Sequence, residues 1–374
     1  MSEWREHKLG DFIEVKHGFA FSGTGITDQP TRNILVTPGN FNIGGGFKNS
    51  KFKHFNYEFP NEYILKTGDI VVTMTDLSQE TDTLGYAAKI PMYDGINFLH
   101  NQRIGLVQFK GSEANEDFIY WLMRTKEYQS FIVGSASGTS IMHTSPSRIK
   151  EYQFLLPSRS EQAAIAEVLS SLDDKIDLLH RQNKTLEQLA ETLFRQWFVE
   201  EAEESWETKS LGDLGDFYNG KSRPSESGLI PVYGGNGILG YANVSNYAGK
   251  SIVIGRVGAY CGSLYYENRD IWVSDNAILL KAKYDSDIYF IFYFLKSIDL
   301  NLMAEGSSHP LLTQTLLKSI EILIPPNSRV QEFYNQVESF KKKIENNQTQ
   351  IRTLTQLRDT LLPKLMGGEV RVRM

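Results

Sequence analysis

Residues 165–197 read IAEVLSSLDDKIDLLHRQNKTLEQLAETLFRQW, and residues 333–365 read FYNQVESFKKKIENNQTQIRTLTQLRDTLLPKL. In each stretch the apolar residues recur at alternating steps of four and three, the heptad seam of a helix that pairs with another helix. Each seam position of the second stretch lies 168 residues after its counterpart in the first. A helix of about 40 residues is roughly 60 Å long and needs a partner along its length. The sequence therefore predicts that the two helices pair with each other.

One asparagine interrupts each seam. The residues expected to pair the helices are Ile165, Leu169, Leu172, Ile176, Leu179, Asn183, Leu186, Val337, Phe340, Ile344, Asn347, Ile351, Leu354 and Leu361. A buried Asn costs stability but can fix the register of the pair; the alternative is that both are tolerated beside a solvated groove. We expect the second helix to fray or kink near Pro363, which lacks a backbone donor, and to end at Gly367.

The duplication extends beyond the helices. Residues near the N-terminus recur 202 positions later: Trp4, Leu9, Gly10, Asp11 and Gly18 as Trp206, Leu211, Gly212, Asp213 and Gly220. A repeat of this length indicates two related globular units, each followed by a helix. We expect domains at residues 1–157 and 206–325, with one long helix and a linker in residues 158–205 and the other helix and a C-terminal tail in residues 326–374. Antiparallel pairing of the helices would place the two domains at opposite ends.

The two domains are expected to be rich in strands. Short β-branched and aromatic runs, such as residues 69–75 and 251–254, alternate with Gly and Asn turns. Each domain also has one strongly aromatic segment, residues 118–122 and 291–295, that is more typical of a buried core helix than of a ligand platform. The predicted fold class is therefore α+β (mixed α/β): two globular domains joined by two long antiparallel coiled-coil helices in a pseudo-two-fold repeat.

Composition excludes several classes of protein. The 374 residues carry a net charge of −6, which argues against a nonspecific coat for nucleic acid. Cys261 is the single cysteine, so we expect neither disulfides nor a thiolate zinc cluster. No apolar run reaches the ~18 residues of a membrane span, and the first residues lack the apolar core of a signal peptide. We expect a cytoplasmic protein that does not contact a membrane.

Motifs for catalysis are missing from the sequence. The seven histidines form no spaced metal-binding pair, and neither a phosphate-binding G-x-x-x-x-G-K-[ST] loop nor a G-x-S-x-G elbow is present. The run Gly234–Gly237 resembles a nucleotide loop only in composition, and we interpret it as a turn. We therefore predict no catalytic residue, no metal site and no cofactor on this chain.

Loops that mix arginines, amides, small hydroxyl residues and aromatics recur at equivalent places in both halves. Arg, Asn and Gln can read base edges, whereas Lys, Ser and Thr can hold phosphates. Ordinary surface loops and shared turns that maintain the fold are the alternative explanation. The candidate DNA-binding residues are Lys16, His17, Lys48, Lys51, Lys53, Thr75, His100, Arg103, Thr139 and Ser140 in the first half, and Tyr218, Lys221, Arg223, Tyr233, Asn236, Arg256, Tyr260, Asn276, Ser307 and His309 in the second.

Taken in order, these features resemble the specificity (S) subunit of type I restriction–modification systems. The resemblance covers essentially the full chain. It rests on unit starts, mid-domain strands, strand exits and the end of the first helix: Lys8–Asp11, Ser210–Asp213, Gly68–Val71, Ile254–Gly258, Trp272–Ala277, Leu155–Pro157, Leu323–Pro325 and Phe194–Phe198. One departure is that Thr73-Met74 stands where the second half has Gly255-Arg256, so Arg256 has no evident equivalent in the first half.

The resemblance implies a non-catalytic subunit with two target recognition domains. Each domain would read one half of a split, asymmetric sequence in double-stranded DNA, and the helices would set the spacing and dock two modification subunits. Those methyltransferase subunits would bind S-adenosylmethionine and methylate adenine, and restriction–translocase subunits would join the full complex. Two other classes remain as alternatives: a catalytic DNA methyltransferase or nuclease, and a coiled-coil scaffold that binds only protein.

Overall fold

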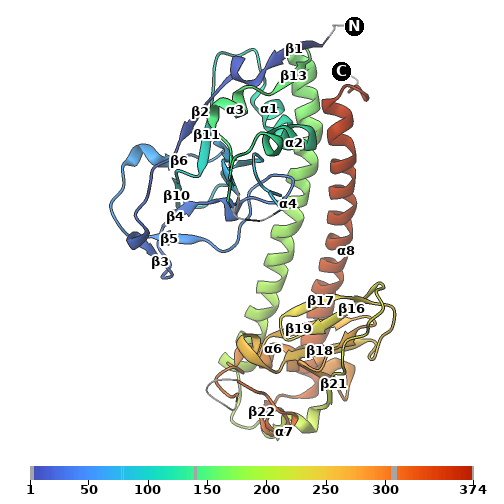
Figure 1. Cartoon of the computed structure of the whole chain (residues 1–374). Helices are drawn as coiled ribbons and strands as arrows, with labels where there is room; N and C mark the ends of the chain where they lie inside the picture. Colours follow the sequence, from blue (N-terminus) through green and yellow to red (C-terminus); the bar gives the residue numbers. More distant parts are fainter. Residues whose placement is uncertain (1–3, 77, 79, 139–140, 305–309, 373–374) are drawn as a thin grey trace. The chain divides into compact units, whose positions relative to one another are not determined.

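The computed structural model describes residues 4–372, apart from residues 77, 79, 139–140 and 305–309. The chain forms two compact units (Figure 1): unit 1 comprises Met1–Leu178 with Gln350–Met374, and unit 2 comprises Leu179–Thr349. Both units mix helices and strands, and the predicted mixed fold class is confirmed. Two long helices, α4 (Arg159–Arg195) and α8 (Asn327–Met366), each contribute residues to both units. Within the described residues no helix is long and apolar enough to span a membrane.

The described residues of unit 1 form four small sheets and three short α-helices. The first and last strands of the unit, β1 and β13, form a two-stranded sheet that we call the clasp. The other sheets are a four-stranded antiparallel sheet of order β2-β11-β7-β9, a five-stranded sheet of order β3-β5-β4-β10-β6 and the pair β12-β8. Strands β10 and β4 run parallel. The elements are β1 (Arg5–Lys8), β2 (Ile13–His17), β3 (Ile26–Thr27), β4 (Asn33–Val36), β5 (Lys53–Phe55), β6 (Ile64–Leu65), β7 (Ile70–Thr73), β8 (Thr75–Asp76), β9 (Ala87–Lys89), β10 (Asn97–His100), β11 (Ile104–Phe109), α1 (Glu116–Leu122), α2 (Lys126–Gly134), β12 (Met142–His143), α3 (Pro146–Lys150) and β13 (Gln153–Leu156).

Unit 2 repeats this plan in a shorter form. It has a two-stranded clasp, a four-stranded antiparallel sheet of order β15-β21-β18-β19 and a three-stranded sheet of order β17-β16-β20. Strands β16 and β20 run parallel, as β4 and β10 do in unit 1. The elements are β14 (Glu207–Ser210), α5 (Leu211–Leu214), β15 (Gly215–Asn219), β16 (Ile230–Gly234), β17 (Gly237–Ala242), β18 (Lys250–Gly255), β19 (Leu264–Asn268), β20 (Trp272–Val273), β21 (Ala277–Ala282), α6 (Ile288–Ser297), α7 (Gln314–Ser319) and β22 (Glu321–Ile324).

The clasp is where the duplicated sequence is easiest to recognise. In unit 1, β1 pairs with β13 and Leu9 N donates to Tyr152 O over 2.8 Å. In unit 2, β14 pairs with β22 and Leu211 N donates to Ile320 O over the same distance. Each clasp therefore joins the start of its domain to the strand that leads into a long helix.

Each aromatic segment lies in a buried core helix, as predicted, and the structure shows that this helix packs on a long helix. In unit 1, Trp121 of α1 is fully buried and its Nε1 donates to Ser170 Oγ of α4 over 2.9 Å. In unit 2, Tyr289 of α6 is buried and its hydroxyl donates to Glu338 of α8 over 2.6 Å. Both pairs span 49 residues, and each partner lies 168 residues from its counterpart. The same docking geometry is therefore built twice with different polar groups.

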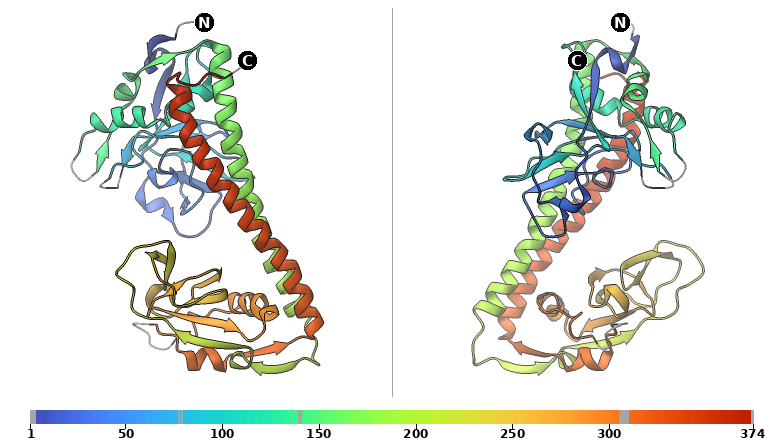
Figure 2. Two further views of the ribbon diagram at one scale, coloured as in Figure 1. Left: turned by 90° about the vertical axis from the view of Figure 1, so that its right-hand side faces the viewer. Right: turned by 60° about the vertical axis from the view of Figure 1, so that its left-hand side comes forward.

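The two long helices lie side by side within each unit (Figure 2). In unit 1, Ile165 and Leu169 near the start of α4 share a buried cluster with Leu362 and Leu365 near the end of α8, so the helices run antiparallel there. In unit 2, Phe194 of α4 packs against Phe333 of α8 with ring centroids 6.0 Å apart. All fourteen seam residues named above are buried or half-buried.

A polar contact crosses the helix pair of unit 2. Asn347 is fully buried, and its Nδ2 donates to Asn183 Oδ1 over 2.9 Å and to Gln182 Oε1 over 3.4 Å. These bonds match one asparagine to the other and favour the register-setting interpretation. Helix α8 continues through Pro363 to Met366, so the proline lies in the last turn, and the helix ends directly before Gly367.

A buried ion network ties the globular part of unit 1 to both helices. Asp173 on α4 accepts from Arg124 Nη1 over 2.6 Å and also pairs with Arg358 on α8. The Arg124 side chain is only 3% exposed and also lies over the Trp121 ring, 4.4 Å from its centroid. Burial alone would raise the pKa of Asp173, but the two guanidinium groups outweigh it and hold the pKa below its usual value of 3.8.

We expect the change Asp173→Asn to destabilise the protein by about 3 kcal/mol, because it leaves the buried Arg124 without a counter-charge. Because the folded-state pKa is lowered, the contribution of Asp173 to stability is present above about pH 4 and is lost as pH falls through that pKa. The variant should lack this part of the acid dependence. Chemical denaturation at several pH values measures both effects, with Asp174→Asn, at an exposed neighbour, as the control. Equal free energies of unfolding for the two variants would contradict the proposed contribution of Asp173 to stability.

Candidate nucleic-acid interface

Several candidate residues of unit 1 meet at one backbone junction, which we call junction 1: residues 16–19, 74–76 and 100–103. The end of β2 lies against the turn between β10 and β11, where Phe19 N donates to His100 O over 2.8 Å and Gln102 N to Phe19 O over 2.9 Å. A Cβ at Gly18 would collide with the carbonyl of Asn101. Only glycine allows this approach, which explains why Gly18 recurs in the repeat.

Junction 2 in unit 2 consists of residues 218–221, 256 and 274–276 and is built in the same way. Lys221 N donates to Val273 O over 3.0 Å, and a Cβ at Gly220 would collide with the carbonyl of Ser274. Gly220 N also donates to Ala277 O over 3.2 Å. The two junctions therefore share a backbone frame that holds loops from three strands together.

Hydrogen bonds align the two junctions residue by residue. Met74 N donates to Arg103 O over 2.9 Å, and Arg256 N donates to Asn276 O over 3.1 Å. Met74 therefore corresponds to Arg256, and Arg103 corresponds to Asn276. Each junction has one arginine at this pair of positions, but the arginines come from opposite members of the pair. The sequence alone did not suggest that Arg103 and Arg256 occupy opposite members of equivalent pairs in the two junctions.

The exposed candidates surround these junctions. At junction 1, His17 and Arg103 are exposed, while Lys16 is half-buried with its Nζ 5.0 Å from the Tyr63 ring centroid. At junction 2 and in the loops beside it, the exposed candidates are Tyr218, Lys221, Arg223, Asn236, Tyr260 and Asn276. The structure thus brings together candidates that are distant in sequence.

Arg256 differs from the other candidates because it is half-buried. Its Nε is buried and has no hydrogen-bond partner among the described residues. Buried polar groups are nearly always paired, so the unpaired Nε beside exposed loops makes Arg256 a candidate for contact with DNA.

The parallel strands explain how further loops reach the junctions. Strand β4 pairs in parallel with β10, with Val36 opposite His100, so segment 37–52 leaves the sheet at junction 1. This segment carries exposed Lys48 and Lys51, and exposed Lys53 follows at the start of β5. In unit 2, β16 pairs in parallel with β20, so the turn after Gly234 emerges beside Ser274 of junction 2.

Three candidates are buried, and we withdraw them as direct contacts. His100 is 1% exposed and its Nε2 bonds to Ile104 O at 2.9 Å; burial lowers its pKa, so the neutral ring supports the turn. Thr75 bonds to His143 Nδ1 at 3.1 Å, and the Tyr233 hydroxyl donates to Glu267. Their residue types suggested recognition, but they face inward on their strands. Thr139, Ser140, Ser307 and His309 lie outside the described residues.

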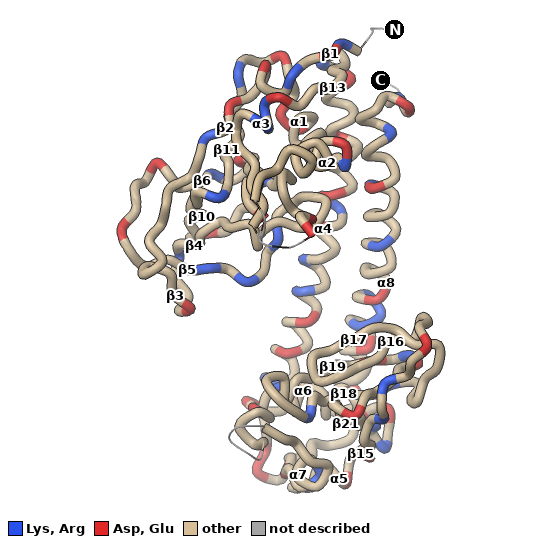
Figure 3. The backbone as a smooth tube through the Cα atoms, in the orientation of Figure 1, with Lys and Arg blue, Asp and Glu red and all other residues tan. Residues whose placement is uncertain are grey.

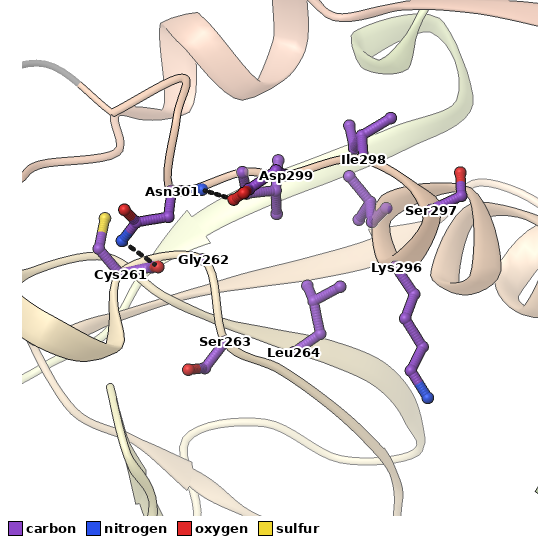
Figure 4. Close-up of a pocket in the computed structure, with 11 residues that line it drawn as sticks. Cys261, Gly262, Ser263, Leu264, Lys296, Ser297, Ile298, Asp299 and Asn301 are labelled. Atoms are coloured by element: carbon purple, nitrogen blue, oxygen red, sulfur yellow. Dashed lines mark hydrogen bonds between the residues drawn. The ribbon is translucent and has the colours of Figure 1, made fainter. Parts of the chain in front are cut away.

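Outside the junctions, the described residues form no cluster of side chains typical of a catalytic or metal site. The cavity of about 540 Å³ in unit 2 is lined by Cys261–Leu264 and Leu295–Asn301 (Figure 4). The Cys261 Sγ donates to Arg256 O at 3.3 Å, and burial raises the pKa of the thiol, which keeps it protonated. Among the described residues no group of three or more His, Cys, Asp or Glu side chains could hold a metal ion. Basic and acidic residues are interspersed along both units (Figure 3).

Comparison with known proteins gives a family in which DNA recognition is expected. A family model described as the type I restriction modification DNA specificity domain matches residues 1–188 and 203–356. The specificity subunit of the type I restriction enzyme MjaIX from Methanocaldococcus jannaschii is 28% identical over 304 residues, covering 68% of this chain and 69% of the relative. The specificity subunit of type I restriction enzyme HindI from Haemophilus influenzae is 22% identical, covering 99% and 100%.

One solved structure shares the fold. The S subunit of a type I restriction–modification system from M. genitalium aligns with a TM-score of 0.62 at 22% identity and covers 97% of this chain and 96% of its own. At this level of identity the likeness establishes the fold and leaves the site residues to be argued from the geometry above.

We expect Gly18→Ala to destabilise unit 1 by about 1–3 kcal/mol, because the added Cβ forces the end of β2 away from Asn101. Gly23→Ala is the matched control in the same unit, since a Cβ there meets nothing within 4 Å. Denaturation midpoints of the two variants test the prediction. Equal midpoints would show that the close approach at junction 1 is not required.

Proposed function

This chain belongs to the family of type I restriction–modification DNA specificity domains, and from that premise we propose how its two units share DNA recognition. The chain is a specificity subunit, whose role is to recognise DNA sequence rather than to catalyse a reaction. We propose that each unit reads one half of a bipartite target in double-stranded DNA through its junction. The observation that carries this proposal is the shared backbone frame of the two junctions.

The two halves of the target should differ in sequence. Both junctions offer one arginine, but Arg103 stands on the turn before β11 whereas Arg256 follows β18. Arginine can bond to guanine in a bidentate manner. The backbone position from which the side chain extends decides which base pair it can reach. Segment 37–52 adds lysines to unit 1 that the tight β16–β17 turn of unit 2 does not match. The proposed target is therefore asymmetric.

The helices carry a second duplicated surface, which we call the stripes: Thr185, Gln188, Leu189 and Thr192 on α4, and Thr353, Gln356, Leu357 and Thr360 on α8. The members of each stripe follow helical spacing along one face, and all are exposed. Leu189 and Leu357 are each 44% exposed. These side chains are not part of the helix seam. Because the same residue types recur in both stripes, they point to a partner that binds twice.

We propose that each stripe docks one modification subunit, so that two copies of the same methyltransferase bind one specificity subunit. S-adenosylmethionine would then be bound by those partners, which would methylate adenine, and restriction–translocase subunits would join the assembly in the cytoplasm. Because α4 and α8 belong to both units, we further propose that their length sets the spacing between the two half-sites. A catalytic DNA methyltransferase or nuclease and a scaffold that binds only protein are the functions this proposal competes with.

We expect Arg103→Ala and Arg256→Ala to relax different halves of one methylation motif. Each loses about 1–3 kcal/mol of base discrimination, because the bidentate contact is removed. Sequencing of modified bases in cells that carry wild type, each variant or a deletion of the gene measures the result. Arg5→Ala is a matched control, because Arg5 is exposed on the clasp, away from junction 1. If deletion removes no bipartite motif, or if both variants keep the full motif, the proposed division of recognition is wrong.

We expect Leu189→Glu and Leu357→Glu each to weaken one of two partner sites by about tenfold, because a charge is placed in an apolar contact. The double variant should bind neither copy tightly. Analytical ultracentrifugation of the complex with the modification subunit gives the stoichiometry. His180→Glu is the control, since His180 is exposed on another face of α4 and is replaced by Gln348 in the repeat. Loss of both copies in a single variant, or of neither in the double variant, would refute the two-stripe proposal.

A further inference from the structure

The ribbon formed by β16 and β17 leaves large apolar side chains in solvent. Strand β17 is an edge of its sheet, and Ile238, Leu239 and Tyr241 are 42%, 44% and 52% exposed. Edge strands are usually protected by charged residues or proline against pairing with other chains. Residues 230–242 contain no charged residue, and their one proline lies on the inner strand β16. The exposed edge therefore needs a functional explanation.

A β-bulge turns two of these side chains outward. Val232 pairs with Gly240 and Tyr233 pairs with Ile238, which leaves Leu239 as the extra residue of β17. Bulges bend a strand and redirect side chains next to functional sites. The backbone makes room for this arrangement at Gly234, where a Cβ would collide with the Leu239 side chain. Ile238 and Leu239 are thus held at the outer surface near the tip of the ribbon.

The tip of the ribbon adjoins junction 2. A Cβ at Gly235 would lie 3.5 Å from Asn276 O and 3.6 Å from Val257 O, the residue after Arg256. Gly237 adopts a φ of 82°, which lets the chain turn within two residues. The ribbon is flanked by cationic residues, because Arg223 lies over Gly240 and exposed Lys221 belongs to junction 2. A ribbon that carries no carboxylate of its own, with these two cations nearby, is suited to a polyanion.

We propose that the β16–β17 ribbon enters the major groove of the half-site bound by unit 2, and that Ile238 and Leu239 read the methyl groups of thymine. The inference rests on the proposed function. The major groove accommodates a two-stranded ribbon, and the thymine methyl is the apolar group it displays. In unit 1 the corresponding strands β4 and β5 are joined by the long segment 37–52 with its lysines. We therefore assign thymine reading to the ribbon of unit 2.

The first test uses cells that contain the complete restriction–modification complex. Wild type is compared with the double variant Ile238→Ala, Leu239→Ala by sequencing of modified bases. We expect the variant to accept other bases at thymine positions in one half of the motif and to keep the other half unchanged, which also shows that it is folded. Tyr284→Ala is the matched control, since Tyr284 is 72% exposed beyond the opposite end of β21 from Asn276. The control should keep the whole motif.

The second test uses the purified complex and duplexes in which deoxyuridine replaces thymine in that half-site. Wild type should bind about fourfold more weakly for each methyl group lost, the effect of one buried carbon, and the double variant should not distinguish the two bases. A half-site without thymine, or equal thymine preference in both proteins, overturns the inference. The inference is also overturned if the double variant keeps the motif intact but shows the same loss of methylation at every site. That result would assign the ribbon to a protein partner. If no methylation motif depends on this chain, the proposed function fails as well.

Discussion

The packing of one aromatic helix against one long helix positions the rest of each unit. Trp121 on Ser170 and Tyr289 on Glu338 are the same contact made with different polar groups. Each brings the sheet of its unit onto the helix seam, and the clasp then closes the domain at the point where the next long helix begins. With the helix face fixed, the strands that end at the junctions have little freedom left.

The two units use this frame with different chemistry. In unit 1 the position beside the docking contact holds the ion network of Arg124, Asp173 and Arg358. The residues 168 positions after Arg124 and Asp173 are Phe292 and Lys341, whose ammonium lies 5.7 Å from the ring centroid. Burial lowers the pKa of Lys341 and so disfavours its charged form, whereas the two guanidinium groups lower the pKa of Asp173 and so favour its charged form. The frame therefore tolerates exchange of an ion pair for a cation over an aromatic ring, as long as the helix remains docked.

The helix pair and the buried cores could be predicted from the sequence more completely than the exposed loops of the junctions. The seam followed from periodicity and from the 168-residue repeat, and the two core helices followed from their aromatic content, because buried faces leave a regular pattern. The bond between Asn183 and Asn347 did not follow from the repeat, because the two asparagines are 164 residues apart. Sequence reasoning did not foresee the burial of His100, Thr75 and Tyr233, because residue type does not reveal which face of a short strand is buried. Ile238 and Leu239, which we propose as thymine contacts, were not among the candidates for the converse reason: apolar residues after a glycine turn are typical of a core strand, and the bulge turns them outward.

The junctions explain how a fixed frame can read different sequences. They are held by backbone hydrogen bonds and by Gly18 and Gly220, so their geometry does not depend on the side chains at the aligned positions. Met74 and Arg256 can therefore differ entirely: Met74 is buried at 3% exposure, and Arg256 has a buried Nε without a hydrogen-bond partner in the described part of the chain. A recognition surface whose backbone is self-supporting can change its base-reading residues without unfolding, which is the physical condition for two unlike half-sites in one duplicated chain.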